Sequence, residues 1–281
     1  MRRFLLFLIL TLYGCSEVAN ASVWRPRSRR YRQAGSAVAL PYQTEYAVDF
    51  ETAGPDSIEC PHEATTGAWT LGVWFKLDNK TGTKDFHTKW NSAVSRSWTI
   101  RHTSTGNLFT FFFGNGLGTG SPTCSGSITD AWCAAGEWCF IATDRTTVWY
   151  GAEGDTISTA TPAGLGGSCP TYGTNPSVPI TLGSTAGGAN PLEGLIGEWW
   201  FYASGLSTSE INEARAATCA SAPTPCPQDL SATSMGVPVR WYRMGDTPGD
   251  DDTTPVLIES GSGGGNCTTW NNTPQIVSGG P

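Results

Sequence analysis

The stretch EGLIGEWWFYASGLSTSEI, residues 193–211, joins the most aromatic segment of the chain to its clearest helix start. Side chains of residues 194–202 alternate in the period of two that is typical of a β-strand with two different faces. This alternation predicts that Trp199 and Phe201 face a core. The opposite face of the same strand is expected to carry Glu198, Trp200 and Tyr202.

A helix is predicted over residues 207–217, STSEINEARAA, directly after this strand. Ser207 is a favourable N-cap, and Glu210 three residues later completes a capping box. The segment CASAPTPCP that follows cannot continue a helix, because proline has no amide hydrogen to donate. The helix is therefore short.

The composition favours many short strands joined by turns, since the 281 residues include 34 glycines, 18 prolines and only 15% charged residues. Alternation in 69–77 places Trp69 and every second residue after it on one face, with Trp74 on the other. Glycine-rich loops are predicted at 114–136 and 152–177. Strands are predicted over 46–50, 69–77, 85–90, 97–102, 107–113, 137–143, 146–151, 179–184, 194–202 and 237–245. The simplest topology is one all-β antiparallel sandwich whose last strand returns beside the first.

The first residues, MRRFLLFLILTLYGCSEVANAS, predict an export signal. The apolar run is shorter than the ~20 residues that span a bilayer. Two processing routes stay open. Ala21 ends a small-x-small cleavage site, which makes residues 1–21 a signal peptide. Cys15 ends a lipobox-like LYGC, in which the cysteine is lipidated. Residues 22–44 then form an arginine-rich linker and 45–281 the folded domain, which predicts a secreted or cell-envelope protein, a lipoprotein under the second route.

Cysteines other than Cys15 number eight, and an even number in an exported chain predicts up to four disulfides. A zinc site is not indicated, because no cysteine pair has the required spacing with histidine partners. Cys219 and Cys226 flank the short loop ASAPTP and are predicted to pair. The eight candidates are Cys60, Cys124, Cys133, Cys139, Cys169, Cys219, Cys226 and Cys267.

Charge separates the start of the chain from the rest, because residues 33–281 hold ten Lys and Arg against 23 Asp and Glu. This acidic body argues against nucleic acid as a partner, since phosphate binding needs a positive face. The basic run VWRPRSRRYR fits a solvated linker, with contact to anionic lipid as the alternative.

Seven segments in order resemble the LamG-like, concanavalin A-like jelly-roll family of bacterial and phage surface proteins. The resemblance covers about residues 46–216. It implies a jelly-roll sandwich with a short helix over one end, and a role in recognition of carbohydrate or surface glycoconjugates. The matching segments are Val48–Phe50 with Ser57-Ile58, Trp69–Lys76, Lys89-Trp90, Gly106–Phe109, Trp138 with Ala142–Asp144 and Trp149-Tyr150, Ile180–Gly183, and Gly194–Ile211.

Two departures from the family pattern carry consequences. Gly197 stands where many members have an aspartate, which removes a carboxylate. Cys139 stands where many members have an aromatic residue or histidine, and it suggests a disulfide with Cys133.

A structural calcium ion is expected at an acidic loop, because calcium binds six to eight oxygens of carboxylates and carbonyls. The alternative is a solvated acidic loop. In related sandwiches a calcium ion lies near the first and last strands, which would bring Asp49 close. The loop residues are Asp246, Asp250, Asp251 and Asp252.

Sugar binding would use exposed aromatic faces, for which the candidates are Trp90, Trp200 and Tyr202, with ordinary sandwich packing as the alternative. No strand carries the paired carboxylates of a glucanase of this fold, and Glu198 stands alone on its strand. A nucleophile elbow is also missing. The prediction is therefore no enzyme, but an exported binding module for glycans in adhesion. The alternatives are a structural or decoration protein of a cell envelope or phage-like particle that contacts other proteins, and a degenerate glycosidase.

Overall fold

In the computed structural model, the described residues begin at Tyr46 and continue with several gaps to Pro281. The predicted signal, lipidation and linker segments in residues 1–44 lie outside the described residues, as do Cys219 and Cys226. The structure describes residues 46–51, 55–63, 67–91, 95–118, 123–165, 169, 173, 175, 177–217, 230–247 and 249–281.

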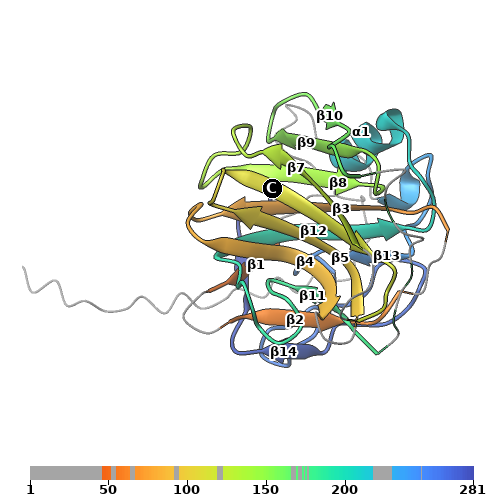
Figure 1. Ribbon diagram of the computed structural model, residues 1–281. Coiled ribbons are helices and arrows are strands. Elements are labelled where there is room, and N and C mark those ends of the chain that lie inside the picture. Colours follow the sequence, from red (N-terminus) through yellow and green to blue (C-terminus); the bar gives the residue numbers. More distant parts are fainter. Residues whose placement is uncertain are drawn as a thin grey trace, which may run out of the picture. The chain divides into compact units, whose positions relative to one another are not determined.

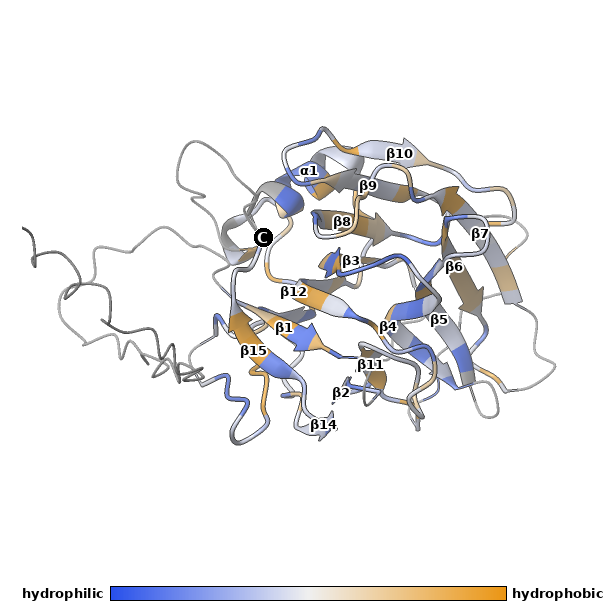
Figure 2. Ribbon diagram, turned by 90° about the vertical axis from the view of Figure 1, so that its left-hand side faces the viewer, coloured by the Kyte–Doolittle hydropathy of each residue, from blue (hydrophilic) through white to orange (hydrophobic). Residues whose placement is uncertain are grey.

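The first sheet contains eight strands in the described part of the chain, all paired antiparallel. Figure 2 shows its path from β10 to β15. β13 (Arg240–Tyr242) pairs with β12 beside this path. The strand order is β10 (Ser158–Ala160), β9 (Val148–Ala152), β8 (Trp138–Thr143), β3 (Thr70–Leu77), β12 (Gly194–Tyr202), β1 (Tyr46–Phe50) and β15 (Gln275–Ser278).

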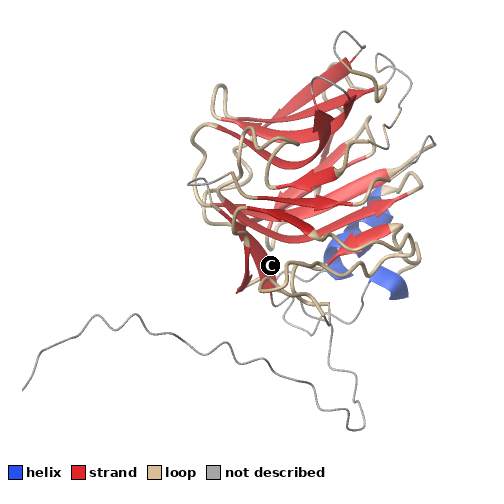
Figure 3. Ribbon diagram, turned by 90° about the horizontal axis from the view of Figure 1, so that it is seen from below, coloured by secondary structure: helices blue, strands red, loops and turns tan. Residues whose placement is uncertain are grey.

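The second sheet contains seven antiparallel strands among the described residues, and the two sheets stack as layers (Figures 1 and 3). The predicted antiparallel sandwich is confirmed. The strand order is β14 (Thr269–Asn271), β2 (Ser57–Cys60), β11 (Ile180–Leu182), β4 (Thr83–Asn91), β5 (Ser95–Thr103), β6 (Leu108–Gly114) and β7 (Thr123–Thr129).

The main core fills the space between the sheets with aromatic rings from both. Phe75 of the first sheet lies 4.4 Å from Phe86 and 5.5 Å from Phe109 of the second, between ring centroids. Phe201 of the first sheet stacks 6.0 Å from Trp98 of the second. Each such ring is fully buried, and burial of a side chain of this size contributes about 1.5–3 kcal/mol.

The helix α1 (Thr208–Ala217) covers the outer face of the first sheet. Its capping box is confirmed: the Glu210 amide donates to Ser207 Oγ at 3.3 Å, and the Ser207 amide donates to Glu210 Oε2 at 2.7 Å. Ile211 and Ala214 pack in a second buried cluster with the outward rings of the first sheet. A 3₁₀ turn at Leu230–Ala232 adds Leu230 to this cover. The helix that follows β12 therefore buries the face of this strand that points away from the main core.

The last strand of the chain, β15, lies beside the first, since Val48 of β1 pairs with Ile276. The strand predicted as last, at 237–245, is β13, and it pairs with β12 instead. Several strands were not predicted, namely β2, β7, β10, β14 and β15. β7 lies in the predicted loop 114–136, and it lacks a clear apolar pattern because its inward positions include Cys124 and Gly126. The late strand is shorter than predicted, and the strand predicted at 146–151 begins later, at Val148, after a turn of Asp144–Thr147.

Three disulfides are present among the described cysteines. Cys60 pairs with Cys267 across 207 positions of sequence, and Cys124 pairs with Cys169 across 45. The expected pair of Cys133 with Cys139 is confirmed. Disulfides are typical of proteins that fold in an oxidising compartment.

Candidate ligand-binding face

The outer face of the second sheet carries polar rows set by the strand register. In one row Asp85 of β4 pairs with Arg101 of β5, which pairs with Thr110 of β6 and then Ser127 of β7. Thr110 and Ser127 share a hydroxyl hydrogen bond of 2.9 Å at the surface. The neighbouring row consists of Thr88, Thr99, Phe112 and Ser125.

Two partly exposed rings lie on this face, each with an arginine over it. The centroids of Trp90 and Phe112 are 6.0 Å apart. The Arg96 guanidinium carbon lies 5.8 Å from the Trp90 ring centroid, and that of Arg101 lies 5.4 Å from the Phe112 ring. Leu117, 61% exposed, accepts the Arg96 amide through its carbonyl at 2.9 Å. We call these five residues the Trp90 patch.

Alternation along β4 turns Trp90 outward, onto the same face as Thr88. The pairing of β4 with β5 shifts register between Lys89 and Trp90, and a bulge of this kind re-aims neighbouring side chains. Lys89 points inward, where its Nζ donates to the carbonyls of Asn175, at 3.1 Å, and Val178. Burial lowers the pKa of Lys89 to about 7. Adjacent positions of β4 therefore carry a buried amine and a surface ring, and the register shift brings Arg96 of β5 opposite Trp90.

Asp85 fixes Arg101 in place over Phe112. Arg101 Nε donates to Asp85 Oδ1 at 2.7 Å, and Nη2 donates to Oδ2 at 3.0 Å. Thr99 and Asn190 also donate to this fully buried carboxylate, at 3.2 and 2.8 Å. A bidentate pair of this kind restricts the orientation of the guanidinium plane.

Arg96 differs from Arg101, because it has no carboxylate partner among the described residues. Its Nε is buried without a hydrogen-bond partner in the described part of the structure. The side chain as a whole is partly exposed, and its guanidinium carbon lies over the Trp90 ring. Its donors are therefore free for a ligand.

Trp200 and Tyr202 do not lie on this face, and the prediction that they expose ring faces is wrong. Trp200 is 0% exposed and Tyr202 is 3% exposed, both in the cluster under α1. The Tyr202 hydroxyl donates to the Gly236 carbonyl at 3.1 Å, and burial raises its pKa. A Cβ on Gly72 of β3 would overlap the Trp200 ring, so this ring lies directly on the sheet.

Sequence reasoning found Trp90 but missed Arg96, Arg101, Phe112 and Leu117. A signal for Phe112 was present. In the run Phe111-Phe112-Phe113 of one strand, alternation requires the middle ring to face away from the core.

Carboxylates of the acidic loop accept hydrogen bonds from backbone amides of the same loop and its neighbours. Asp250 Oδ2 accepts the amides of Gly245 and Thr247 at 2.9 and 3.1 Å, and Oδ1 accepts that of Ile258 at 2.6 Å. Burial raises the pKa of Asp250 to about 6. Asp251 Oδ1 accepts the Thr253 amide at 2.8 Å.

Two other acids of this loop reach the paired terminal strands. Asp246 Oδ2 accepts the Tyr46 amide of β1 at 3.4 Å, and Asp252 Oδ2 accepts the Ile276 amide of β15 at 3.2 Å. Asp49 lies on β1, where burial and then the charge of Glu51 raise its pKa. The described residues contain no group of three or more His, Cys, Asp or Glu side chains placed to hold a metal ion. The calcium site stays a prediction.

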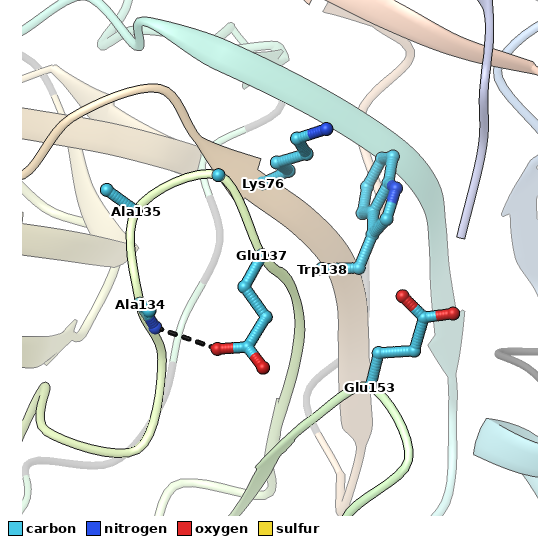
Figure 4. Close-up of a pocket in the computed structure, with 7 residues that line it drawn as sticks. Lys76, Ala134, Ala135, Glu137, Trp138 and Glu153 are labelled. Atoms are coloured by element: carbon cyan, nitrogen blue, oxygen red, sulfur yellow. Dashed lines mark hydrogen bonds between the residues drawn. The ribbon is translucent and has the colours of Figure 1, made fainter.

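A shallow hollow of about 650 Å³ opens beside the Cys133–Cys139 loop (Figure 4). Lys76, Trp138 and Glu153 line it, with Lys76 and Trp138 as cross-strand neighbours. Glu137 also lines the hollow, and its carboxylate accepts a hydrogen bond from the Ala134 amide at 3.0 Å.

Close packing beside this hollow explains why residue 197 is a glycine. A Cβ there would overlap the ring of Pro281 and approach Trp138. The aspartate of the family pattern is therefore excluded by close packing at this position. Glu198, the next residue, is buried and accepts a hydrogen bond from the Trp241 indole. Its carboxylate therefore holds a ring of the cluster that covers the first sheet.

Comparison of the sequence with protein-family models gave no match. Comparison with curated protein sequences gave none either. Among solved structures, a Bacteroides ovatus protein described as carbohydrate-binding is similar at a TM-score of 0.52 and 11% identity, over 83% of this chain and 60% of that one. At this identity the likeness shows a shared fold, the lectin-like jelly roll.

Two further structures have lower scores. A pentraxin of Limulus polyphemus has a TM-score of 0.46 and 11% identity, over 84% of this chain and 95% of that one. The CBM40 domain of a Ruminococcus gnavus sialidase has a TM-score of 0.41 and 15% identity, over 59% of this chain and 96% of that one. In the described residues, no helix is long and apolar enough to cross a membrane.

Proposed function

We propose that this protein is a non-catalytic carbohydrate-binding module that binds glycans through the Trp90 patch. One observation carries the proposal: two partly exposed rings with arginines over them lie beside surface hydroxyls. Aromatic faces stack on the apolar faces of sugar rings, while guanidinium and hydroxyl groups bond their hydroxyls. The opposite outer face of the sandwich is covered by α1, which leaves this face as the better candidate.

Family and location form part of the same proposal. The ordered sequence motifs and the jelly-roll fold support membership of the LamG-like family. Three disulfides support folding outside the cytoplasm, which fits a secreted or cell-envelope protein. The lipobox-like segment at Cys15 makes a lipid anchor the second route to the envelope.

A glycan array followed by calorimetry on the best ligand tests this function. We expect Trp90→Ala and Phe112→Ala each to weaken binding about tenfold, since loss of one aromatic contact costs ~0.5–1.5 kcal/mol or more. Val237→Ala serves as the control, because Val237 is 43% exposed and lies off the patch. Equal binding by all three variants would exclude the patch, and no glycan binding by the folded wild type would exclude the function.

A protein partner is the second candidate, favoured by the exposure of Leu117 beside Arg96. Aromatic residues and arginine are enriched in the buried centres of protein interfaces. Retention of an envelope or particle complex on the immobilised wild type, but not on Leu117→Asp, together with silence on the array, would select this role.

Turnover would overturn the non-catalytic proposal. Glu137 and Glu153 both line the hollow, although the Glu137 carboxylate is held by the Ala134 amide. Array ligands and β-glucans are therefore incubated with the protein and analysed for released sugars. Release that Glu137→Gln or Glu153→Gln abolishes would identify a glycosidase.

A further inference from the structure

The two arginines of the patch have different tasks. Arg101 is held by both oxygens of Asp85. Arg96 rests on Trp90 and has no carboxylate partner among the described residues. A guanidinium stacked on a ring uses its face in that contact, so its in-plane N–H donors stay available to bond an acceptor at its edge.

From this arrangement we propose, on the basis of the glycan-binding function above, that the ligand is an acidic oligosaccharide whose sugar carboxylate binds the Nη edge of Arg96. Guanidinium and carboxylate match as planar groups with two parallel hydrogen bonds. The sugar ring beside that carboxylate then stacks on Trp90 or Phe112, 6.0 Å apart.

The charge around the patch favours a carboxylate over a neutral sugar. Asp85 is the acid that the register places on this face beside Arg101, and it is fully buried and paired. The accessible charge is therefore the positive one of Arg96. Because Arg96 already lies over a ring, a ligand carboxylate meets a preorganised donor.

The wider charge limits the ligand to a short acidic oligosaccharide. Residues 33–281 hold 23 acids against ten basic residues, so a dense polyanion is repelled by the rest of the domain. Strands lie about 4.8 Å apart, so the face from β4 to β7 spans about 14 Å. Over that length the ligand passes from Trp90 to the hydroxyls of Thr110 and Ser127.

The test is calorimetry with trigalacturonate and its trimethyl ester, which differ in charge and share the same sugar chain. A sialylated trisaccharide and its neutral disaccharide form a second pair that distinguishes uronic from sialic acids as the source of the carboxylate. We expect the wild type to prefer an acid to its neutral counterpart by about tenfold or more, as charged hydrogen bonds imply. This preference should shrink as salt is raised.

The variants assign the preference to one side chain. In Arg96→Gln the preference should fall to about onefold while binding of the neutral form persists, and Arg96→Lys should restore it in part, because lysine lacks the planar fork. Arg243→Gln is the matched control, since Arg243 lies 5.6 Å from the Trp241 ring on the other side of the sandwich. Circular dichroism confirms that each variant is folded.

Each outcome has one reading. Equal binding of acid and neutral forms by the wild type overturns the proposal and leaves glycan binding intact. A preference that survives Arg96→Gln, or that Arg243→Gln also abolishes, overturns it too. Binding of neither form of either pair, with no hit on the array, overturns the function itself.

Discussion

Removal of the Cys60–Cys267 disulfide should destabilise the protein more than removal of either of the other two described bridges. This bridge joins the end of β2 to the segment before β14, across 207 positions. The Cys133–Cys139 bridge spans only six. A cross-link lowers the conformational entropy of the unfolded chain, and the effect grows with the logarithm of loop length. The two bridges therefore provide a long and a short loop in one molecule.

The chain-entropy relation gives about 5 kcal/mol for the Cys60–Cys267 loop and about 2 kcal/mol for the Cys133–Cys139 loop. The double variant Cys60→Ala with Cys267→Ala is thus expected to lose about 3 kcal/mol more than the other double variant. The comparison is fair, because all four cysteines are almost fully buried and the local packing losses are similar.

Urea unfolding of both double variants and the wild type, without reductant, measures these losses by linear extrapolation. Domains have a total stability of about 5–15 kcal/mol, so the variant without the Cys60–Cys267 bridge can unfold while the variant without the Cys133–Cys139 bridge stays folded. That result would also support the prediction. Equal losses, or a larger loss for the short loop, would refute the reasoning.

Three further predictions concern packing, acid stability and calcium. Gly72→Ala should cost about 1–3 kcal/mol in urea unfolding, because its methyl group overlaps Trp200, whereas Gly67→Ala, with open space around it, should change little. Burial lowers the pKa of His87 to about 3, so the unfolded state binds a proton that the folded state refuses as the pH falls from 6.5 to 3. Stability should therefore decline over that window, and His87→Gln should flatten the decline in urea midpoints; an unchanged slope would contradict this. If calcium binds the acidic loop, it should raise the melting temperature of the wild type and not of Asp250→Asn; the same shift in both would argue against the site.

Sequence pattern predicted the fold well where alternation was strong. β3 and β12 separate their inward and outward residues as expected, and Ser207 caps the helix as predicted. Short or glycine-containing strands such as β7 were missed, because their inward positions lack large apolar side chains. Their pairing depends on neighbours distant in sequence, which local periodicity does not report.

The site was predicted only in part, since alternation reports which face a side chain takes and not what covers that face. Trp200 and Trp90 both point away from the main core. The helix α1 covers Trp200, whereas Trp90, on the other sheet, stays partly exposed. The register shift that places Arg96 opposite Trp90 and the pairing of Arg101 with Asp85 arise from tertiary contacts between strands. Those features set the chemistry of the face.

The sealing of one side of the sandwich by α1 has a practical consequence for immobilisation. Asn212 is exposed on this helix, which lies over the outer face of the first sheet. A biotin attached there would couple the protein to a sensor chip through its closed side. The Trp90 patch, on the opposite sheet, would then face the flowing analyte.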